Sequence, residues 1–171
     1  MHTNLKKLQK IQDKIVSWET AQSRCQKWKD SGDELVFTNG CFDLIHYGHI
    51  HYLSCAASLG QRLVVGLNSD ASVRKLKGRH RPVKDELSRT STLASFEFVD
   101  LVIIFEQETP EELIEYLRPD VLVKGGDWPI EKIVGADFIQ DIGGQVHSLN
   151  YLEGYSSTNF EQKIIEVAQN K

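Results

Sequence analysis

The sequence contains few cysteines and no long apolar segment. Its three cysteines, Cys25, Cys41 and Cys55, are an odd number and are spaced too widely for a CxxC pair, which favours a reduced protein without a disulfide framework. The longest aliphatic and aromatic run, 101–105, is far shorter than the about 20 residues that a transmembrane helix needs. Residues 1–10 lack the apolar core of an export signal. These absences predict a cytoplasmic protein with no membrane span.

The sequence also has no excess of basic residues. Lys and Arg number 20 against 24 Asp and Glu, for a net charge of −4, which disfavours general binding of nucleic acid. Hydrophobic residues make up 40% and charged residues 26% of the chain, as is typical of a folded globular protein. At about 150 residues per domain, a length of 171 residues predicts one compact unit with at most a small appendage.

Five short apolar segments, each typical of a buried strand, alternate with segments of helical periodicity. The strands are predicted at 34–38, 62–67, 99–105, 121–123 and 145–149. Nearly continuous apolar strands between helices indicate a parallel sheet that is covered on both faces. We therefore predict an α/β fold, a Rossmann-like, doubly wound, five-stranded parallel sheet with helices on both faces.

Two amphipathic helices are predicted before the first strand, because apolar residues recur there at spacings of three and four. Ser17 is a candidate N-cap of the second helix. We expect residues 1–33 to form an amino-terminal helical appendage and residues 34–171 to form the main domain. The apolar faces of the two helices are candidates to dock a second subunit in a homodimer.

Two further helix boundaries carry local signals. Thr109, Pro110 and Glu112 predict a capping box, with Thr109 as the N-cap and Pro110 as the first helical residue. Gly60 predicts a left-handed end for the helix that begins at Tyr47.

The fold prediction by itself locates a site. In open parallel sheets, ligands bind beyond the carboxyl ends of the strands, where the strand order reverses. Four polar or glycine-bearing segments follow predicted strands, so we expect them to converge there: 39–49, 68–70, 124–127 and 156–158.

The first of these segments contains the most specific pattern, an HxGH sequence at the start of a helix. His46 and His49 are three residues apart and share one helical face, so both imidazoles can face one ligand. Unpaired N–H groups and the positive dipole end at a helix start favour phosphate, and Gly48 lets phosphate approach the backbone. Two alternatives stay open, namely surface histidines on a capped helix and a metal site completed by Cys41 or Asp43.

Other charged and hydroxyl residues are candidates for binding phosphate or nucleotide, and each of them also has a purely structural interpretation. Lys75, Lys77, Arg79 and Arg81 form a basic segment that contacts phosphates or is a solvated turn. Asp43 and Asp70 face a nucleotide or its Mg²⁺, or they cap helices. Residues 156–158 hold pyrophosphate or cap the last helix.

The HxGH segment and several other motifs resemble those of a known family. Residues 38–49 resemble the HxGH signature of the nucleotidyltransferase superfamily that includes the cytidylyltransferases, and Ser156-Ser157-Thr158 resembles its carboxyl-terminal motif. More closely, six segments in order are similar to the adenylyltransferase domain of bacterial heptose 1-phosphate kinase/adenylyltransferases: 38–43, 68–73, 75–78, 81–83, 120–127 and 157–159. The resemblance covers roughly residues 14–170 and identifies 34–171 as a nucleotidyltransferase domain.

The resemblance implies transfer of AMP from ATP to D-glycero-β-D-manno-heptose 1-phosphate. The products are pyrophosphate and ADP-heptose, a precursor of the lipopolysaccharide inner core, and Mg²⁺ accompanies ATP. The larger bifunctional members of this family also carry a sugar kinase, which 171 residues cannot hold, so we expect a separate heptose kinase to supply the sugar 1-phosphate. The implied partners are ATP and a sugar 1-phosphate, without nucleic acid or membrane.

The residue pattern and the resemblance together assign candidate roles. The catalytic candidates are His46, His49, Lys77 and Arg89, of which Arg89 comes from the alignment of 86–89 alone. The candidates for binding the acceptor are Lys124 and Asp127, and no direct protein ligand to a metal is predicted. The nucleotide-binding candidates are Phe37, Thr38, Asn39, Gly40, Cys41, Phe42, Asp43, Gly48, Asp70, Lys124, Gly125, Ser156, Ser157 and Thr158.

Three rival functions stay open. A cytidylyltransferase would act on glycerol phosphate or another small phosphoalcohol, and residue types alone do not separate ATP from CTP. Tyr151 stands where other superfamily branches carry a basic residue, which weakens the glycerol phosphate alternative. A nucleotide-binding sensor would bind ATP without turnover, and a histidine-based metal module would hold zinc.

Overall fold

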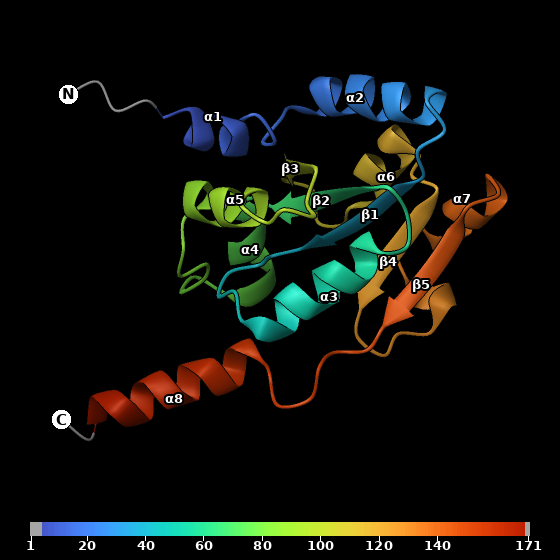
Figure 1. Cartoon of the computed structure of the whole chain (residues 1–171). Coiled ribbons are helices and arrows are strands. Elements are labelled where there is room, and N and C mark those ends of the chain that lie inside the picture. The colour runs from blue at the N-terminus through green and yellow to red at the C-terminus, as the bar shows by residue number, and fades with distance from the viewer. Residues whose placement is uncertain (1–4, 170–171) are drawn as a thin grey trace.

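The protein forms a five-stranded parallel sheet with helices on both faces (Figure 1). The structure is a computed structural model that describes residues 5–169. The strand order is β3-β2-β1-β4-β5, so it reverses between β1 and β4. The predicted fold class is confirmed. The strands are β1 Leu35–Gly40, β2 Arg62–Asn68, β3 Leu101–Phe105, β4 Val121–Gly125 and β5 Gln145–Leu149.

Helices connect the strands and extend the chain at both ends. Before the sheet come α1 Lys6–Gln12 and α2 Trp18–Asp30, and after it comes α8 Ser157–Gln169. The connecting helices are α3 Tyr47–Ala57, α4 Asp70–Lys77, α5 Glu86–Ala94, α6 Glu111–Leu117, the 3-10 turn η1 Ile130–Lys132, and α7 Ala136–Asp141.

The core has two layers because successive strand residues point to opposite faces of the sheet. In β1, Leu35 and Phe37 pack with α2, α6 and α7 on one face, whereas Val36 packs with α3 and α5 on the other. Strands β2, β3 and β4 alternate in the same way between the two clusters. This division explains why the strands read as nearly continuous apolar runs.

The helix α2 is part of this core. The Ser17 side chain accepts a hydrogen bond from the Thr20 backbone N–H at 3.3 Å, which confirms the predicted cap. Ala21 and Cys25 are buried in the same cluster as β1 and β3, and the Trp18 indole N–H donates to the Ile104 carbonyl at 2.9 Å. The division of the chain after residue 33 stays a prediction, although α2 and the sheet share one apolar layer.

Two of the predicted helix boundaries are wrong. Pro110, and not Thr109, is the N-cap of α6, and no side chain caps this helix, because the Glu112 carboxylate accepts instead from the Gln107 side chain at 3.0 Å. The helix α3 ends in the ordinary right-handed conformation at Ser58. Gly60 is needed for close packing, since a Cβ there would lie 2.8 Å from the Glu34 carbonyl oxygen.

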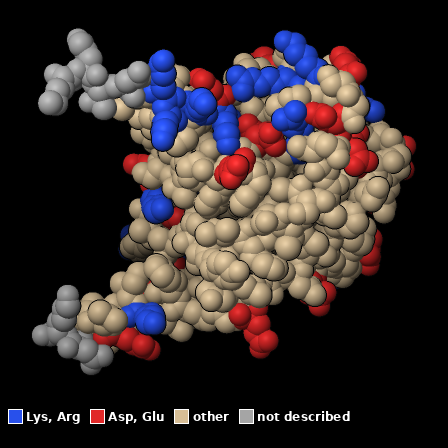
Figure 2. Space-filling view, in the orientation of Figure 1, with Lys and Arg blue, Asp and Glu red and all other residues tan. Residues whose placement is uncertain are grey.

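Outside the core, α8 lies apart from the sheet and projects from the body of the molecule (Figure 1). None of its described side chains is buried, and Phe160, Ile164, Ile165 and Val167 are each about half exposed. Figure 2 shows the lysine and arginine side chains of this face gathered mainly over α1 and α2. Among residues 5–169, no helix combines the length and apolar character that crossing a bilayer requires.

The two-layer core predicts different costs for two leucine truncations. Leu113 is 0% exposed and Leu87 is 71% exposed, although both lie on helices. Leu113→Ala should lower the free energy of unfolding by about 2–5 kcal/mol, because it leaves a cavity. Leu87→Ala should change it by less than about 0.5 kcal/mol. Urea unfolding measures both values, and equal losses would contradict the assignment of the core.

Candidate active site

A cavity of about 540 Å³ opens at the carboxyl ends of β1 and β4. This is the point at which the strand order reverses, as the fold predicts. The cavity is lined from β1 and the following loop, α3, α4, β4 and α8, which brings together residues far apart in sequence. The lining residues are Asn39, Gly40, Cys41, Phe42, Asp43, His49, Tyr52, Lys77, Arg81, Lys124, Gly125, Tyr151, Ser157, Thr158 and Glu161.

The two histidines lie together at the start of α3. Their ring centroids are 3.9 Å apart, with 40° between the ring planes. The His46 backbone N–H donates to His49 Nδ1 at 3.4 Å, which assigns the proton of the neutral His49 ring to Nε2. The buried Nδ1 of His46 has no hydrogen-bond partner among the described residues. Gly48 permits this arrangement, because a Cβ there would lie only 3.0 Å from His46 Nδ1.

Both imidazoles are held in the neutral form at pH 7. Burial, with smaller contributions from His46 and Lys77, lowers the pKa of His49 to about 4. Burial also lowers the pKa of His46. A neutral imidazole donates one N–H and accepts at the other nitrogen, so His49 presents Nε2–H as a donor without carrying a charge.

Cationic side chains surround the cavity from three elements. Lys77 ends α4 and Lys124 lies near the end of β4. The ammonium of Lys124 donates to the Asn39 side chain at 3.4 Å, and burial lowers the pKa of Lys124. Arg81 pairs with Asp43 at 2.8 Å and with Glu161 on α8. This excess of cations suits a polyanionic ligand.

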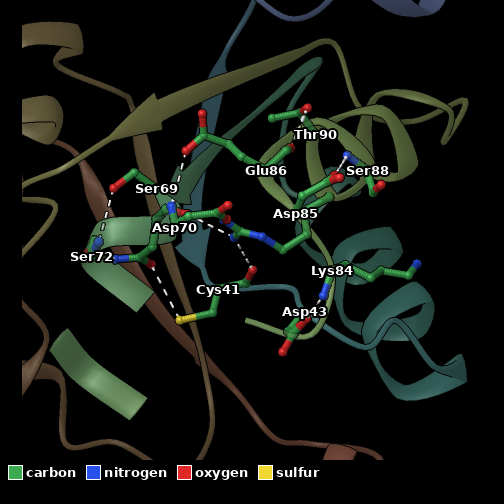
Figure 3. Close-up of polar contacts among 12 residues, drawn as sticks. Cys41, Asp43, Ser69, Asp70, Ser72, Lys84, Asp85, Glu86, Ser88 and Thr90 are labelled. Atoms are coloured by element: carbon green, nitrogen blue, oxygen red, sulfur yellow. Dashed lines mark hydrogen bonds and ion pairs between the residues drawn. The ribbon is translucent and has the colours of Figure 1, made fainter. Parts of the chain in front are cut away.

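A buried guanidinium fixes the loop that follows β1. Arg89 on α5 is 0% exposed. Its Nη1 donates to the carbonyls of Cys41 at 2.7 Å and Asn68 at 2.8 Å, and its Nη2 donates to Asp70 at 2.7 Å. Two of these partners, Cys41 and Asp70, are labelled in Figure 3. Arg89 therefore ties together the loops after β1 and β2 from behind the cavity.

Asp43 holds a second contact between loops. Its carboxylate accepts from the backbone N–H groups of Val83 at 2.9 Å and Lys84 at 2.9 Å, besides pairing with Arg81. Its pKa is lowered because these hydrogen bonds and Arg81 outweigh the desolvation that acts against them. Both carboxylate oxygens are thus occupied by the protein (Figure 3).

The structure divides the predicted site residues into three groups. Eleven of them line the cavity: Asn39, Gly40, Cys41, Phe42, Asp43, His49, Lys77, Lys124, Gly125, Ser157 and Thr158. His46, Gly48 and Ser156 line an adjoining cavity of about 280 Å³ that shares His49 and Lys77 with the first. Phe37, Thr38, Asp70, Arg89 and Asp127 line neither of these two cavities.

Sequence reasoning missed three residues of the cavity wall. Tyr52 follows His49 by three residues on α3, and its hydroxyl lies 2.5 Å from the Thr38 hydroxyl; this spacing was the available signal. Tyr151 packs close to Gly125, where a Cβ would lie 2.9 Å from its ring. Burial raises the pKa of both tyrosines. Glu161 belongs to no local pattern and reaches the cavity only because α8 is placed there.

The site does not offer a ready set of protein ligands for a metal ion. Within residues 5–169, no three His, Cys, Asp or Glu side chains are placed to hold one together. Asp43 and Glu161 pair with Arg81, and Asp70 pairs with Arg89. Because these carboxylates are paired with arginines, a divalent cation here would be held mainly by phosphate oxygens and water, a common arrangement for Mg²⁺.

Comparisons with known proteins decide the family. Residues 37–163 match the family model described as cytidylyltransferase-like. The chain belongs to the cytidylyltransferase-like family. The family range includes the HxGH segment, the basic segment and the first residues of α8, so the resemblance that the motifs predicted is confirmed.

Some relatives are about 50% identical to this chain in sequence. The chain is 50% identical over 152 residues, 89% of its length, to the protein named bifunctional protein HldE of Magnetococcus marinus. It is 52% identical over 136 residues, 80% of its length, to the protein of the same name from Geotalea uraniireducens. The chain spans 31% and 28% of these two relatives, respectively.

Solved structures agree with the fold. A lipopolysaccharide core biosynthesis protein from Thermoplasma volcanium is 30% identical, with a TM-score of 0.57 over 73% of this chain and 100% of that one. A pantoate-beta-alanine ligase from Francisella tularensis, 13% identical, has a TM-score of 0.58 over 86% of this chain and 75% of that one. The second likeness concerns the fold alone.

The burial of Arg89 predicts a loss of stability when its charge is removed. Arg89→Met leaves Asp70 and two carbonyls without their donor, so the free energy of unfolding should fall by about 3 kcal/mol. Arg74→Met, which changes an exposed arginine on α4, is the matched control and should be nearly neutral. Urea unfolding measures the stability of both variants, and equal urea midpoints would contradict the structural role of Arg89.

The lowered pKa of His49 predicts a dependence of stability on pH. The unfolded chain binds a proton at His49 near the ordinary pKa of 6.5, whereas the folded chain binds it only near 4. Stability from this residue should therefore be lost as the pH falls from 6.5 to about 4. His49→Gln should flatten the fall in the urea midpoint over this range. Parallel curves for the parent and the variant would argue against a buried, neutral ring.

Proposed function

We propose that this chain transfers AMP from ATP to D-glycero-β-D-manno-heptose 1-phosphate, giving ADP-heptose and pyrophosphate. The observation that carries the proposal is the pair of neutral histidines, His46 and His49, beside a cavity lined by three cations. Two further observations support it. Relatives about 50% identical are named bifunctional protein HldE, and the motifs resemble the adenylyltransferase domain of heptose kinase/adenylyltransferases.

The chemistry needs alignment and charge neutralisation more than a protein nucleophile. An oxygen of the sugar phosphate is already anionic and attacks the α-phosphorus of ATP, while the bond to the pyrophosphate oxygen breaks. Catalysis then depends on holding the two phosphates in line and on stabilising the charge that develops on them. This reaction requires no Ser-His-Asp triad.

In this proposal we assign a role to each group of residues. His49 donates Nε2–H to an oxygen of the α-phosphate, and His46, which lies beside it in the adjoining cavity, donates to a second phosphate oxygen in the transition state. Lys77 and Arg81 face the triphosphate, and Lys124 faces the acceptor phosphate. Arg89 acts as a positioning residue, because it holds the Cys41 backbone and does not line the cavity.

The start of α8 supplies the remaining phosphate contacts. Ser157 and Thr158 line the cavity, and their hydroxyl groups and N–H groups suit pyrophosphate oxygens. Ser156 accepts from the Asn159 N–H at 3.0 Å, so this serine caps the helix. Arg81 and Glu161 hold α8 to the segment that follows α4.

A divalent cation, which we propose is Mg²⁺, accompanies ATP and neutralises charge on the β- and γ-phosphates. The reaction uses cytoplasmic ATP. Its acceptor is a sugar 1-phosphate, so a kinase reaction must supply it. A homodimer stays a prediction, with the exposed Leu5 and Leu8 of the amino-terminal segment among its candidate contacts.

Substitution of the two histidines is the central test of the proposed function. His46→Ala and His49→Ala should each lower turnover by about 10²–10³, as expected when one donor to a developing charge is lost. The assay detects ADP-heptose by mass spectrometry after incubation with ATP, Mg²⁺ and synthetic heptose 1-phosphate. His51→Ala, which removes an exposed histidine from the same helix, is the control and should retain the parent rate.

Parallel reactions with CTP, and with glycerol phosphate as the acceptor, test the cytidylyltransferase alternative. Product from these substrates alone would replace the proposal with that alternative. Binding of ATP without acceptor-dependent pyrophosphate would favour a sensor, and near-parent rates in both histidine variants would reject the assigned roles.

A further inference from the structure

A separate cavity of about 260 Å³ adjoins the main one across the ends of β1 and β4. We refer to it as the tryptophan cavity. It lies toward α6 and η1, on the opposite face of the sheet from α3. Its lining residues are Asn39, Pro110, Leu122, Lys124, Trp128, Lys132, Ile133 and Val134. Asn39 and Lys124 line both cavities, so these two side chains form a shared wall.

The indole of Trp128 is held in place although it is 49% exposed. Its N–H donates to the Gly125 carbonyl at 3.2 Å, and its backbone N–H donates to the Ser148 hydroxyl at 3.0 Å. Gly126 has a φ of +116°, and a Cβ there would lie 2.7 Å from the indole nitrogen. The glycine turn after β4 therefore sets the position of this ring.

The other two tryptophans are engaged elsewhere. Trp18 donates to a carbonyl of β3 and packs against Tyr116 at 5.6 Å between centroids, and the guanidinium of Arg62 covers Trp28 at 5.0 Å. Trp128 has an open surface and a fixed orientation. An aromatic surface that is already ordered costs little entropy when a ligand packs on it.

The lining of the tryptophan cavity combines apolar surface with positive charge. Lys124 and Lys132 contribute two ammonium groups, and no carboxylate is among the described lining residues. An apolar wall with a few polar groups is the usual composition of a small-molecule site. The volume is about half that of the main cavity, 260 against 540 Å³, which suits the smaller of two substrates.

We propose that the tryptophan cavity binds the sugar ring of the acceptor, with one face of the ring stacked on Trp128 and the 1-phosphate on Lys124. This inference rests on the proposed function and adds a specificity-determining residue to it. The C–H groups of a pyranose form an apolar face that packs on an indole, while its hydroxyl groups point outward toward donors such as Lys132. A phosphate on the shared wall faces the α-phosphate of ATP in the main cavity.

The test measures acceptor and nucleotide binding separately. With heptose 1-phosphate as the varied substrate, Trp128→Ala should raise KM by about 3- to 10-fold, the range of an aromatic contact. The KM for ATP should stay within about 2-fold. Trp128→Phe keeps an aromatic ring and should restore most of the acceptor affinity. Lys132→Met removes a proposed donor to the sugar hydroxyl groups and should also raise the acceptor KM. Its control is Lys27→Met, on the exposed surface of α2, which should leave both constants unchanged.

Tryptophan emission is a binding readout that does not depend on turnover, and inhibition by inorganic phosphate adds a kinetic control. Heptose 1-phosphate added to the parent without ATP should change the tryptophan emission, and Trp128→Phe should abolish that change. Inorganic phosphate, which lacks the ring, should inhibit the parent and Trp128→Ala equally.

The outcomes separate the two proposals. An active parent with an unchanged acceptor KM in Trp128→Ala overturns the sugar subsite and leaves the proposed function in place. A rise in the KM for ATP alone also overturns it, since Trp128 would then contact the base. A parent that adenylylates no sugar 1-phosphate, and whose emission does not respond to one, overturns both.

Discussion

The site depends on the divergence of the chain at two neighbouring parallel strands. β1 and β4 pair directly, but the chain leaves β1 toward α3 on one face of the sheet and leaves β4 toward η1 and α7 on the other. A crevice therefore opens between these two connections, at the carboxyl ends of the strands. The HxGH segment follows β1 and the glycine turn follows β4, and each therefore borders this crevice.

Burial then sets the charge of the groups in the crevice. His46 is neutral because desolvation penalises its protonation, and at His49 neighbouring positive charge adds to the desolvation. Lys77 and Lys124 supply fixed positive charge, whereas Arg81 is paired with Asp43 and Glu161. Neutral donors beside fixed cations suit a reaction in which negative charge shifts between phosphates. Because Arg89 has its charge committed to two carbonyls and Asp70, it supports the loop and leaves phosphate binding to other residues.

Much of this arrangement could be predicted from local patterns. Apolar strands, helical spacings and the Ser17 cap depend on near neighbours in sequence, and the HxGH segment places two side chains on one helical turn. The boundary at Thr109 was wrong because a side-chain contact between Gln107 and Glu112 competes with the capping box. Gly60 was misinterpreted because its packing against Glu34 joins two segments that no local pattern relates.

By itself, the sequence determined the order and type of the elements and the histidine pair, since each depends on residues that are close together in the chain. It also determined the family, through motifs that follow one another in order along the chain. Only the tertiary structure decided that Arg89 is buried, that Glu161 pairs with Arg81 across 80 positions, and that Asn39 and Lys124 separate two cavities. Such contacts arise from the packing of whole elements around the sheet. The energies of these contacts depend on burial and on distances in space, and neither can be obtained from the spacing of residues along the chain.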